Sequence, residues 1–202
     1  MDTNKVEDCS NLKYSLLHYI SKPKSVPEDK LKALLDIFRK QMFEKDVVLL
    51  NQGDLWTKVY FVEQGIVRFF FNTADGREFN KNFFAEGNFF WPATPATSFH
   101  PSLFSIATLE TSYLWVADYV PFRQQLIALH RWDSFTLPFA QALADQKINR
   151  EYEFLMLDAK ARYLSFLKEY PQLVRRIPDY HIASYLGMTN VTLSRLKRRF
   201  RF

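Results

Sequence analysis

The chain has 202 residues, of which 48% are hydrophobic, so it can bury a substantial core in one large or two small domains. Its single cysteine, Cys9, excludes an intramolecular disulfide and any site that needs several thiolates, including an iron–sulfur cluster. No run approaches the roughly 18 apolar residues of a membrane span, and the first residues are polar. These features predict a cytoplasmic protein that contacts no membrane.

The net charge of +5 is unevenly distributed. Residues 158–202 carry ten Lys or Arg against three Asp or Glu, a net charge of +7. The remaining residues carry 17 against 19, a net charge of −2. A basic C-terminal segment predicts a polyanionic partner, although a solvated basic helix would have the same composition.

Residues 10–40 have apolar residues at helical spacing, and Pro23 and Pro27 divide them into two short helices. From Val47 the pattern changes to short runs rich in β-branched and aromatic residues, separated by Gly or Asp-Gly signals. Such runs at about ten-residue spacing predict an α+β protein built on an antiparallel β-roll, or jelly roll. The expected strands are 47–50, 58–64, 66–72, 77–84, 104–110 and 112–117.

The helical period returns after Pro121, with one helix expected at 122–130 and a longer one beginning near Thr136. Pro138 is then acceptable because it falls in the first turn. Further helices are expected at 158–169 and from Asp179 onward. The longer helix carries an apolar stripe that is either core packing against the roll or a dimer seam. The stripe consists of Ala144, Ile148, Tyr152 and Leu155.

The C-terminal segment has the features of a helix-turn-helix in the expected order. Ala183 is small where two helices would cross closely, and Gly187 can adopt the positive φ of a tight turn. We expect helices at about 179–186 and 190–199, with Thr189 as the N-cap of the second. Apolar residues occupy the inner face, so five other residues must project outward. These are Asn190, Val191, Ser194, Arg195 and Arg198.

The outward residues are of the types that read a major groove. Asn pairs with adenine, Arg pairs with guanine, and an aliphatic side chain contacts a thymine methyl group. We expect Lys197, Arg199 and Arg201 to contact phosphates, which adds affinity without sequence information. A generic helical hairpin with a basic surface is the alternative.

These motifs resemble the Crp/Fnr family of bacterial transcription regulators over nearly the whole chain. The residues that carry the resemblance are 51–54 (NQGD), 65–68 (GIVR), 75–78 (DGRE), 86–89 (EGNF) and 182–199 (IASYLGMTNVTLSRLKRR). The segment 161–178 is similar to the Bacteroidetes-type branch. The resemblance implies N-terminal helices with a cyclic-nucleotide-binding-like roll at 1–131, a linking and dimer helix at 132–157, and a helix-turn-helix domain at 158–202.

The resemblance also implies a homodimer that reads a palindromic site in double-stranded DNA, with RNA polymerase as a further partner. Carried onto this sequence, the base-reading positions fall on Asn190, Val191 and Arg195. The positions near phosphates fall on Thr189, Thr192 and Arg198, beside Lys197 and Arg199.

The predicted roll lacks the cation that a cyclic nucleotide needs. No Arg or Lys lies between Lys81 and Arg123, and a buried phosphate without a basic partner is unfavourable. We therefore expect the roll not to bind cyclic AMP. Its many aromatic residues either fill the roll or form a pocket for an apolar or aromatic small-molecule effector, and a haem would need His100 as axial ligand. The predicted pocket residues are Phe89, Phe90, Trp91 and Ser105.

The sequence gives no sign of an enzyme. The four histidines are scattered, so no metal site can be assembled locally, and no nucleophile elbow or P-loop is present. We expect no cofactor. A second hypothesis is a ligand-sensing or protein-interaction module with a vestigial helix-turn-helix, since we expect no winged hairpin after the recognition helix.

Overall fold

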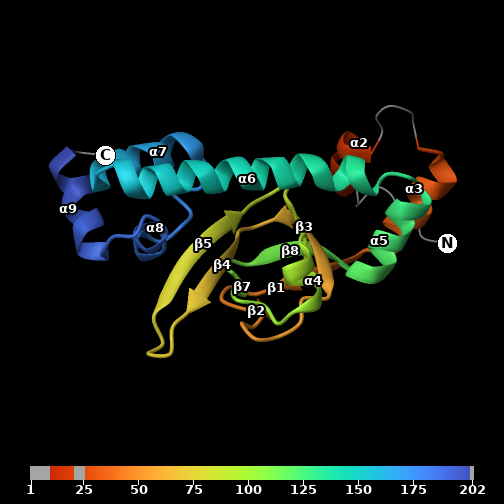
Figure 1. Cartoon of the computed structure of the whole chain (residues 1–202), viewed down its shortest axis with the longest axis horizontal. Coiled ribbons are helices and arrows are strands. Elements are labelled where there is room, and N and C mark those ends of the chain that lie inside the picture. The colour runs from red at the N-terminus through yellow and green to blue at the C-terminus, as the bar shows by residue number, and fades with distance from the viewer. Residues whose placement is uncertain (1–9, 21–25, 201–202) are drawn as a thin grey trace.

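The computed structural model describes residues 10–20 and 26–200, which leaves Cys9, Pro23 and Arg201 outside the described residues. The described residues form eight strands and eight helices (Figure 1). The strands are β1 (Arg39–Phe43), β2 (Val48–Leu50), β3 (Lys58–Gln64), β4 (Val67–Asn72), β5 (Glu78–Phe84), β6 (Phe89–Phe90), β7 (Ser105–Thr108) and β8 (Ser112–Asp118). The helices are α2 (Ser10–Ile20), α3 (Glu28–Leu35), α4 (Pro95–Phe99), α5 (Tyr119–Ala128), α6 (Trp132–Met156), α7 (Ala159–Glu169), α8 (Asp179–Tyr185) and α9 (Asn190–Phe200).

The strands form two antiparallel four-stranded sheets, in the orders β1-β8-β3-β6 and β2-β7-β4-β5. The predicted α+β fold with an antiparallel roll is therefore confirmed. All six predicted strands are present, but β1 was missed because four of its five residues are exposed. An edge strand with this composition lacks the alternation that signals a half-buried strand.

The aromatic residues of the roll pack its interior. Trp56, Phe69 and Phe90 belong to one buried cluster between the sheets. The rings of Phe69 and Phe104 stack at 5.1 Å between centroids, and those of Tyr60 and Phe90 at 4.8 Å. These contacts favour packing over a ligand cavity as the explanation for most of the aromatic residues in the roll.

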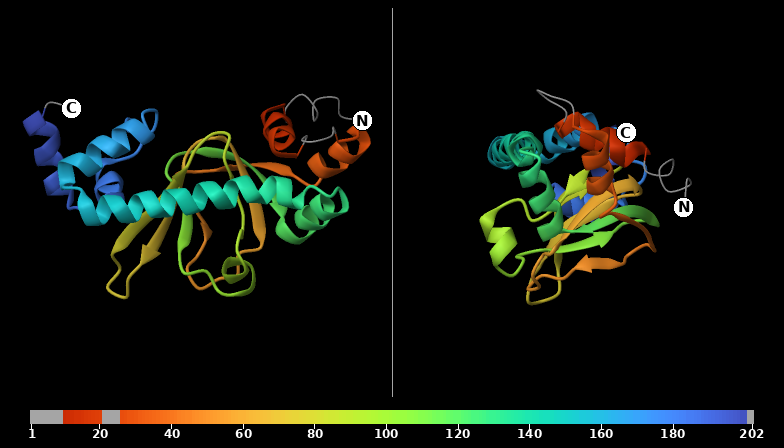
Figure 2. Two further views of the ribbon diagram at one scale, coloured as in Figure 1. Left: turned by 45° about the horizontal axis from the view of Figure 1, so that its top comes forward. Right: turned by 90° about the vertical axis from the view of Figure 1, so that its right-hand side faces the viewer.

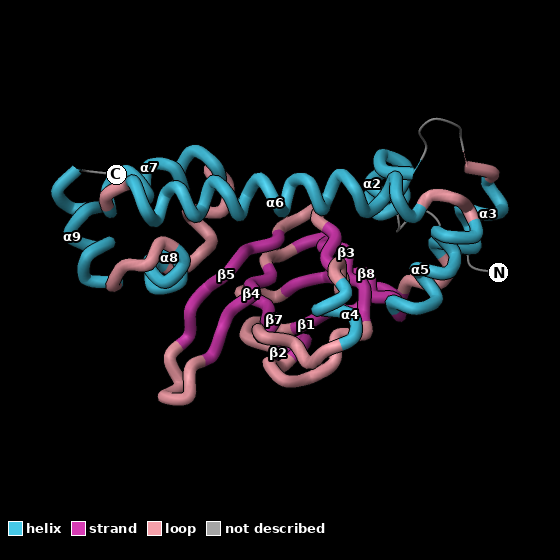
Figure 3. The backbone as a smooth tube through the Cα atoms, viewed as in Figure 1, coloured by secondary structure: helices cyan, strands magenta, loops and turns pink. Residues whose placement is uncertain are grey.

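Helix α6 crosses the roll and connects the two ends of the molecule (Figures 1 and 2). Figure 3 shows α2, α3 and α5 at one of its ends and α7, α8 and α9 at the other. The expected start near Thr136 was wrong, because α6 begins at Trp132 and Pro138 lies inside the helix. No helix within the described ranges is long and apolar enough to cross a membrane.

Helix α6 has apolar residues on two opposite faces. Phe135 is fully buried against the roll and the N-terminal helices. On the other face, Ile148, Tyr152 and Leu155 are 64%, 57% and 75% exposed. Core packing is therefore the wrong explanation for this stripe within the monomer, and the dimer seam remains as a prediction.

Candidate nucleic-acid interface and sensor

Helices α8 and α9 form the predicted helix-turn-helix, with bounds within one residue of those expected. Gly187 lies between them with a φ of +64°, the conformation that glycine adopts most readily. A Cβ atom at this position would lie 2.4 Å from Cε1 of Phe154 on α6. The turn therefore needs glycine both for its backbone conformation and for its close approach to α6.

Helix α9 begins with the predicted cap. The Thr189 hydroxyl accepts a hydrogen bond from the Thr192 amide at 3.1 Å, which satisfies one of the free N–H groups of the first turn. The two threonine hydroxyls also lie 2.8 Å apart. Leu193 is fully buried and fixes which side of α9 faces the domain core.

Much of the surface of α9 is open to solvent. Asn190, Val191 and Arg195 are exposed, with Val191 at 58%, and they follow one another along the first half of the helix. Arg198 and Arg199 are exposed in its last turn. The arrangement brings the predicted base readers and most of the predicted phosphate contacts to one surface; their contacts with DNA stay a prediction.

Lys197 differs from the other basic residues of α9. It is half-buried, and its ammonium group forms an ion pair with Asp179 in the first turn of α8. This pair joins the two helices of the motif. Lys197 would have to leave Asp179 before it could contact a phosphate, so its predicted role competes with a structural one.

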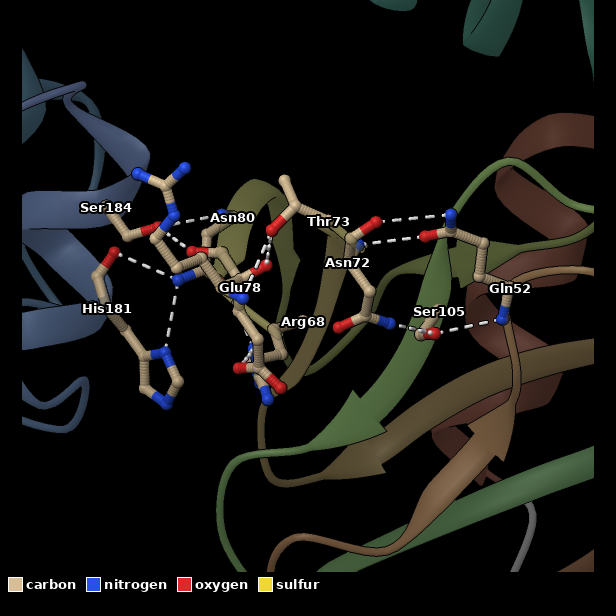
Figure 4. A network of polar contacts seen from close by, with 10 residues as sticks. Gln52, Arg68, Asn72, Thr73, Glu78, Asn80, Ser105, His181 and Ser184 are labelled. Atoms are coloured by element: carbon tan, nitrogen blue, oxygen red, sulfur yellow. Dashed lines mark hydrogen bonds and ion pairs between the residues drawn. The ribbon is translucent and has the colours of Figure 1, made fainter. Parts of the chain in front are cut away.

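Polar contacts dock α8 onto the roll (Figure 4). The backbone N–H of Asn80 on β5 donates to the Ser184 hydroxyl at 3.0 Å. That hydroxyl in turn donates to the backbone carbonyl of Glu78 at 3.1 Å. Arg68 of β4 forms an ion pair with Glu78 at 2.7 Å and donates to the Asn80 side-chain oxygen at 3.3 Å. The hairpin of β4 and β5 thus holds the first helix of the helix-turn-helix.

His181 of α8 is buried in this network, as are Arg68 and Asn80. The Asn80 side-chain nitrogen lies 3.1 Å from Nδ1 of His181 and 3.2 Å from its carbonyl oxygen. Because an amide nitrogen can only donate, Nδ1 must be the unprotonated acceptor and the imidazole is neutral. Burial, with the nearby charge of Arg68, lowers the pKa of His181 to about 4.

A second contact joins the two parts through Arg176, which follows α7. Its guanidinium donates two hydrogen bonds to the Glu86 carboxylate, at 2.7 and 3.0 Å, and a further one to Glu110. Burial alone would raise the pKa of Glu86, but hydrogen bonds from Arg176 and the Gly65 amide lower it to about 2. This pair and the α8 network were not predicted, because they join residues that lie 66 to 106 positions apart in the chain.

The four predicted effector-pocket residues do not meet in one pocket, so that prediction was wrong. Alternation along the β6 segment directs Phe90 into the roll interior and Phe89 and Trp91 toward α6. Ser105 instead accepts hydrogen bonds from the Gln52 amide and the Asn72 side chain, both at 2.9 Å (Figure 4). Phe89 and Trp91 do share a cleft with Phe135 and Phe139 of α6.

Lys81 directly precedes the segment 82–122, which contains no Arg or Lys. The structure places its side chain against aromatic rings. Its ammonium group lies 5.0 Å from the ring centre of Phe104 and 5.7 Å from that of Phe69. Burial, with the positive charges of Lys147 and Arg150, lowers the pKa of Lys81 to about 8. His100 is exposed at the end of α4, and no group of three metal-ligating side chains occurs among the described residues.

Comparisons with known proteins agree with this architecture. Residues 40–128 match the cyclic nucleotide-binding domain family, a segment that includes β2 to β8 and α5. No curated protein matches the chain. The class defined by the fold is a cyclic-nucleotide-binding-like roll joined through a long helix to a helix-turn-helix.

Solved structures of bacterial regulators share this fold across most of the chain. The regulator CLP of Xanthomonas campestris, described as responsive to c-di-GMP, has 14% identity and a TM-score of 0.68, and 87% of this chain and 92% of that chain are covered. A CooA mutant from Carboxydothermus hydrogenoformans has 20% identity and a TM-score of 0.67, with 93% and 83% covered. A regulator assigned to the Crp/Fnr family from Eubacterium rectale has 17% identity and a TM-score of 0.66, with 87% and 84% covered. The resemblance to Crp/Fnr regulators is therefore confirmed for the fold.

Proposed function

We propose that the protein is a DNA-binding transcription regulator of the Crp/Fnr type. The observation that carries this proposal is the orientation of α9, which buries Leu193 and leaves Asn190, Val191 and Arg195 exposed. In a helix-turn-helix, the exposed N-terminal half of the second helix enters the major groove and reads base edges. Arg198 and Arg199, with the capping residues Thr189 and Thr192, then contact phosphates. No catalytic step is part of this function, and the cytoplasm is its expected location.

We further propose that the protein acts as a homodimer through α6. The stripe formed by Ile148, Tyr152 and Leu155 lies opposite the face that packs on the roll, and its exposed large side chains support a helix–helix seam. A two-fold axis along this seam would place two copies of α9 on a palindromic site. The three parts of the regulator would be 1–131, 132–157 and 158–202.

A gel-shift assay with genomic fragments, the protein's own promoter included, tests DNA binding. Arg195→Ala should weaken binding by roughly 1–3 kcal/mol and relax the preference at one base pair. Lys32→Ala is the matched control, because Lys32 is an exposed cation on α3, far from α9 in the chain. An equal loss on every sequence would make Arg195 a phosphate contact. No binding to any fragment at low salt would favour the ligand-sensing or protein-interaction module instead.

Sedimentation equilibrium tests the dimer. Leu155→Lys places a charge in the proposed seam and should shift the protein toward monomer. Phe99→Lys is the control, because Phe99 is a comparably exposed apolar residue on α4, outside α6. A dimer that persists in Leu155→Lys with wild-type affinity would contradict a seam on this face.

The roll would respond to something other than cyclic AMP. Aromatic contacts such as that of Phe69 with Phe104 fill its interior, and residues 82–122 contain no Arg or Lys. Calorimetric titration with cyclic AMP should therefore give no saturable heat. A saturable signal that disappears in Lys81→Met would instead assign Lys81 as the partner of the phosphate.

A further inference from the structure

The face of the roll that meets α6 contains a cleft of about 340 Å³. Phe84, Phe89 and Trp91 line it from the roll, and Phe139 and Leu143 line it from α6. Glu169 and Tyr170, at the end of α7, close one side. The cleft thus lies where the sensor roll, the long helix and the helix-turn-helix domain meet.

We infer that this cleft binds a small, neutral, planar aromatic compound that carries a hydrogen-bond acceptor. Eight of its fourteen lining residues are aromatic. Several of these rings pack against one another and so form fixed walls. The ring of Trp91 lies 4.3 Å from that of Phe139 and 4.8 Å from that of Phe135. Walls made of ring faces and edges suit a flat aromatic ligand better than a flexible chain.

The indole of Trp91 provides the requirement for an acceptor. Trp91 is 2% exposed, and among the described residues its buried Nε1 has no hydrogen-bond partner. An indole nitrogen can only donate, and a buried donor without a partner is unfavourable. A carbonyl or ether oxygen of a bound ligand would satisfy it.

Uncharged polar groups form the other end of the cleft. The Gln146 side-chain nitrogen donates to the Tyr170 hydroxyl at 2.9 Å, and the amides of Gln146 and Asn82 exchange hydrogen bonds at 3.2 and 3.3 Å. Burial and the adjacent Tyr185 hydroxyl raise the pKa of Tyr170, so its hydroxyl stays neutral. These three residues come from β5, α6 and the end of α7.

The charge of the lining excludes an anion. Glu169 is the single charged residue among the described residues that line the cleft, and no Lys or Arg is among them. A phosphate or carboxylate in the cleft would face this carboxylate without a cation to compensate it. Lys81 does not line the cleft and lies against Phe69 and Phe104 instead.

A ligand in this cleft would contact all three parts of the chain at once. Because Tyr170 and Asn82 are joined through Gln146, a bound ring would act on the angle between the roll and the helix-turn-helix domain. This consequence rests on the proposed regulatory function. The binding site itself does not, since it can be measured without DNA.

The test is a fluorescence titration of the full chain with the neutral naphthyl ketone prodan, whose emission shifts to shorter wavelength in an apolar site. We expect saturable binding with one site per chain, and competition by acetylnaphthalene but not by the anion naphthoate. Ala142→Phe, which fills the cleft from the exposed side of α6, should weaken prodan binding at least about tenfold. Leu143→Trp is a second filling variant. Leu103→Ala, at an exposed leucine that does not line the cleft, is the matched control and should not change it.

Trp91→Phe tests the hydrogen bond separately. It should weaken acetylnaphthalene about three- to tenfold and leave naphthalene, which has no acceptor, unchanged. Wild-type prodan binding in both filling variants, or tighter binding of naphthoate than of acetylnaphthalene, would overturn the inference. Failure of the gel-shift assay would refute the proposed function and leave these results intact.

Discussion

Lowering the pH from about 7.5 to about 5 should destabilise the docked helix-turn-helix through His181. In the docked state its pKa is about 4, whereas an exposed imidazole has a pKa of about 6.5. Between these values the unfolded chain binds a proton that the folded chain does not, so the stability present at neutral pH is lost as the pH falls. The linkage relation then gives a loss of about 2 kcal/mol over this interval.

Denaturant unfolding at the two pH values measures this loss. His181→Asn is the matched variant, because its side-chain oxygen can still accept from Asn80 but does not titrate. The pH-dependent loss should fall below about 0.5 kcal/mol in the variant. The carboxylate of Glu86 does not interfere, since its pKa is about 2 and its contribution is lost only below about pH 4.5.

The result that would refute this reasoning is an equal loss of stability in the wild type and in His181→Asn. The pH dependence would then come from titratable groups other than His181. The charged groups that act on His181 itself are Arg68 on β4 and Lys45 and Asp46 before β2.

Three further perturbations follow from the contacts around the helix-turn-helix. Gly187→Ala should lower the free energy of unfolding by about 1–3 kcal/mol, because the new Cβ meets Phe154 and φ is positive; a neutral result in denaturant unfolding would contradict this. Thr189→Ala should cost about 1 kcal/mol through loss of the cap, with Thr189→Ser as the control that keeps it. Arg176→Leu should move the pKa of Glu86 from about 2 toward the ordinary carboxylate range in an NMR titration, and an unchanged pKa would show that Arg176 does not lower it.

Local patterns in the sequence determined most of the elements. The runs rich in β-branched and aromatic residues predicted six strands, with β3 at its exact bounds, and the order of Ala183, Gly187 and Thr189 predicted both helices of the C-terminal motif. These signals succeed because strand propensity, a positive φ and an N-cap each depend on residues close together in the chain. Where the local signal is weak, as in the exposed edge strand β1 or around Pro138 in α6, the expectation was wrong or absent.

Tertiary structure alone decided what surrounds the candidate sites. The sequence contains His181, Asn80 and Arg176 but gives no reason to join α8 to β5 or Arg176 to Glu86. The sequence also grouped Phe90 with Trp91 in one predicted pocket. Strand alternation instead directs Phe90 into the roll interior and Trp91 into the cleft beside α6. Such contacts depend on which faces of distant elements meet, and no short-range pattern encodes them. The sequence by itself thus determined the two helices of the helix-turn-helix, and the packing of the roll, α6 and α7 decided where the cleft among these three elements lies.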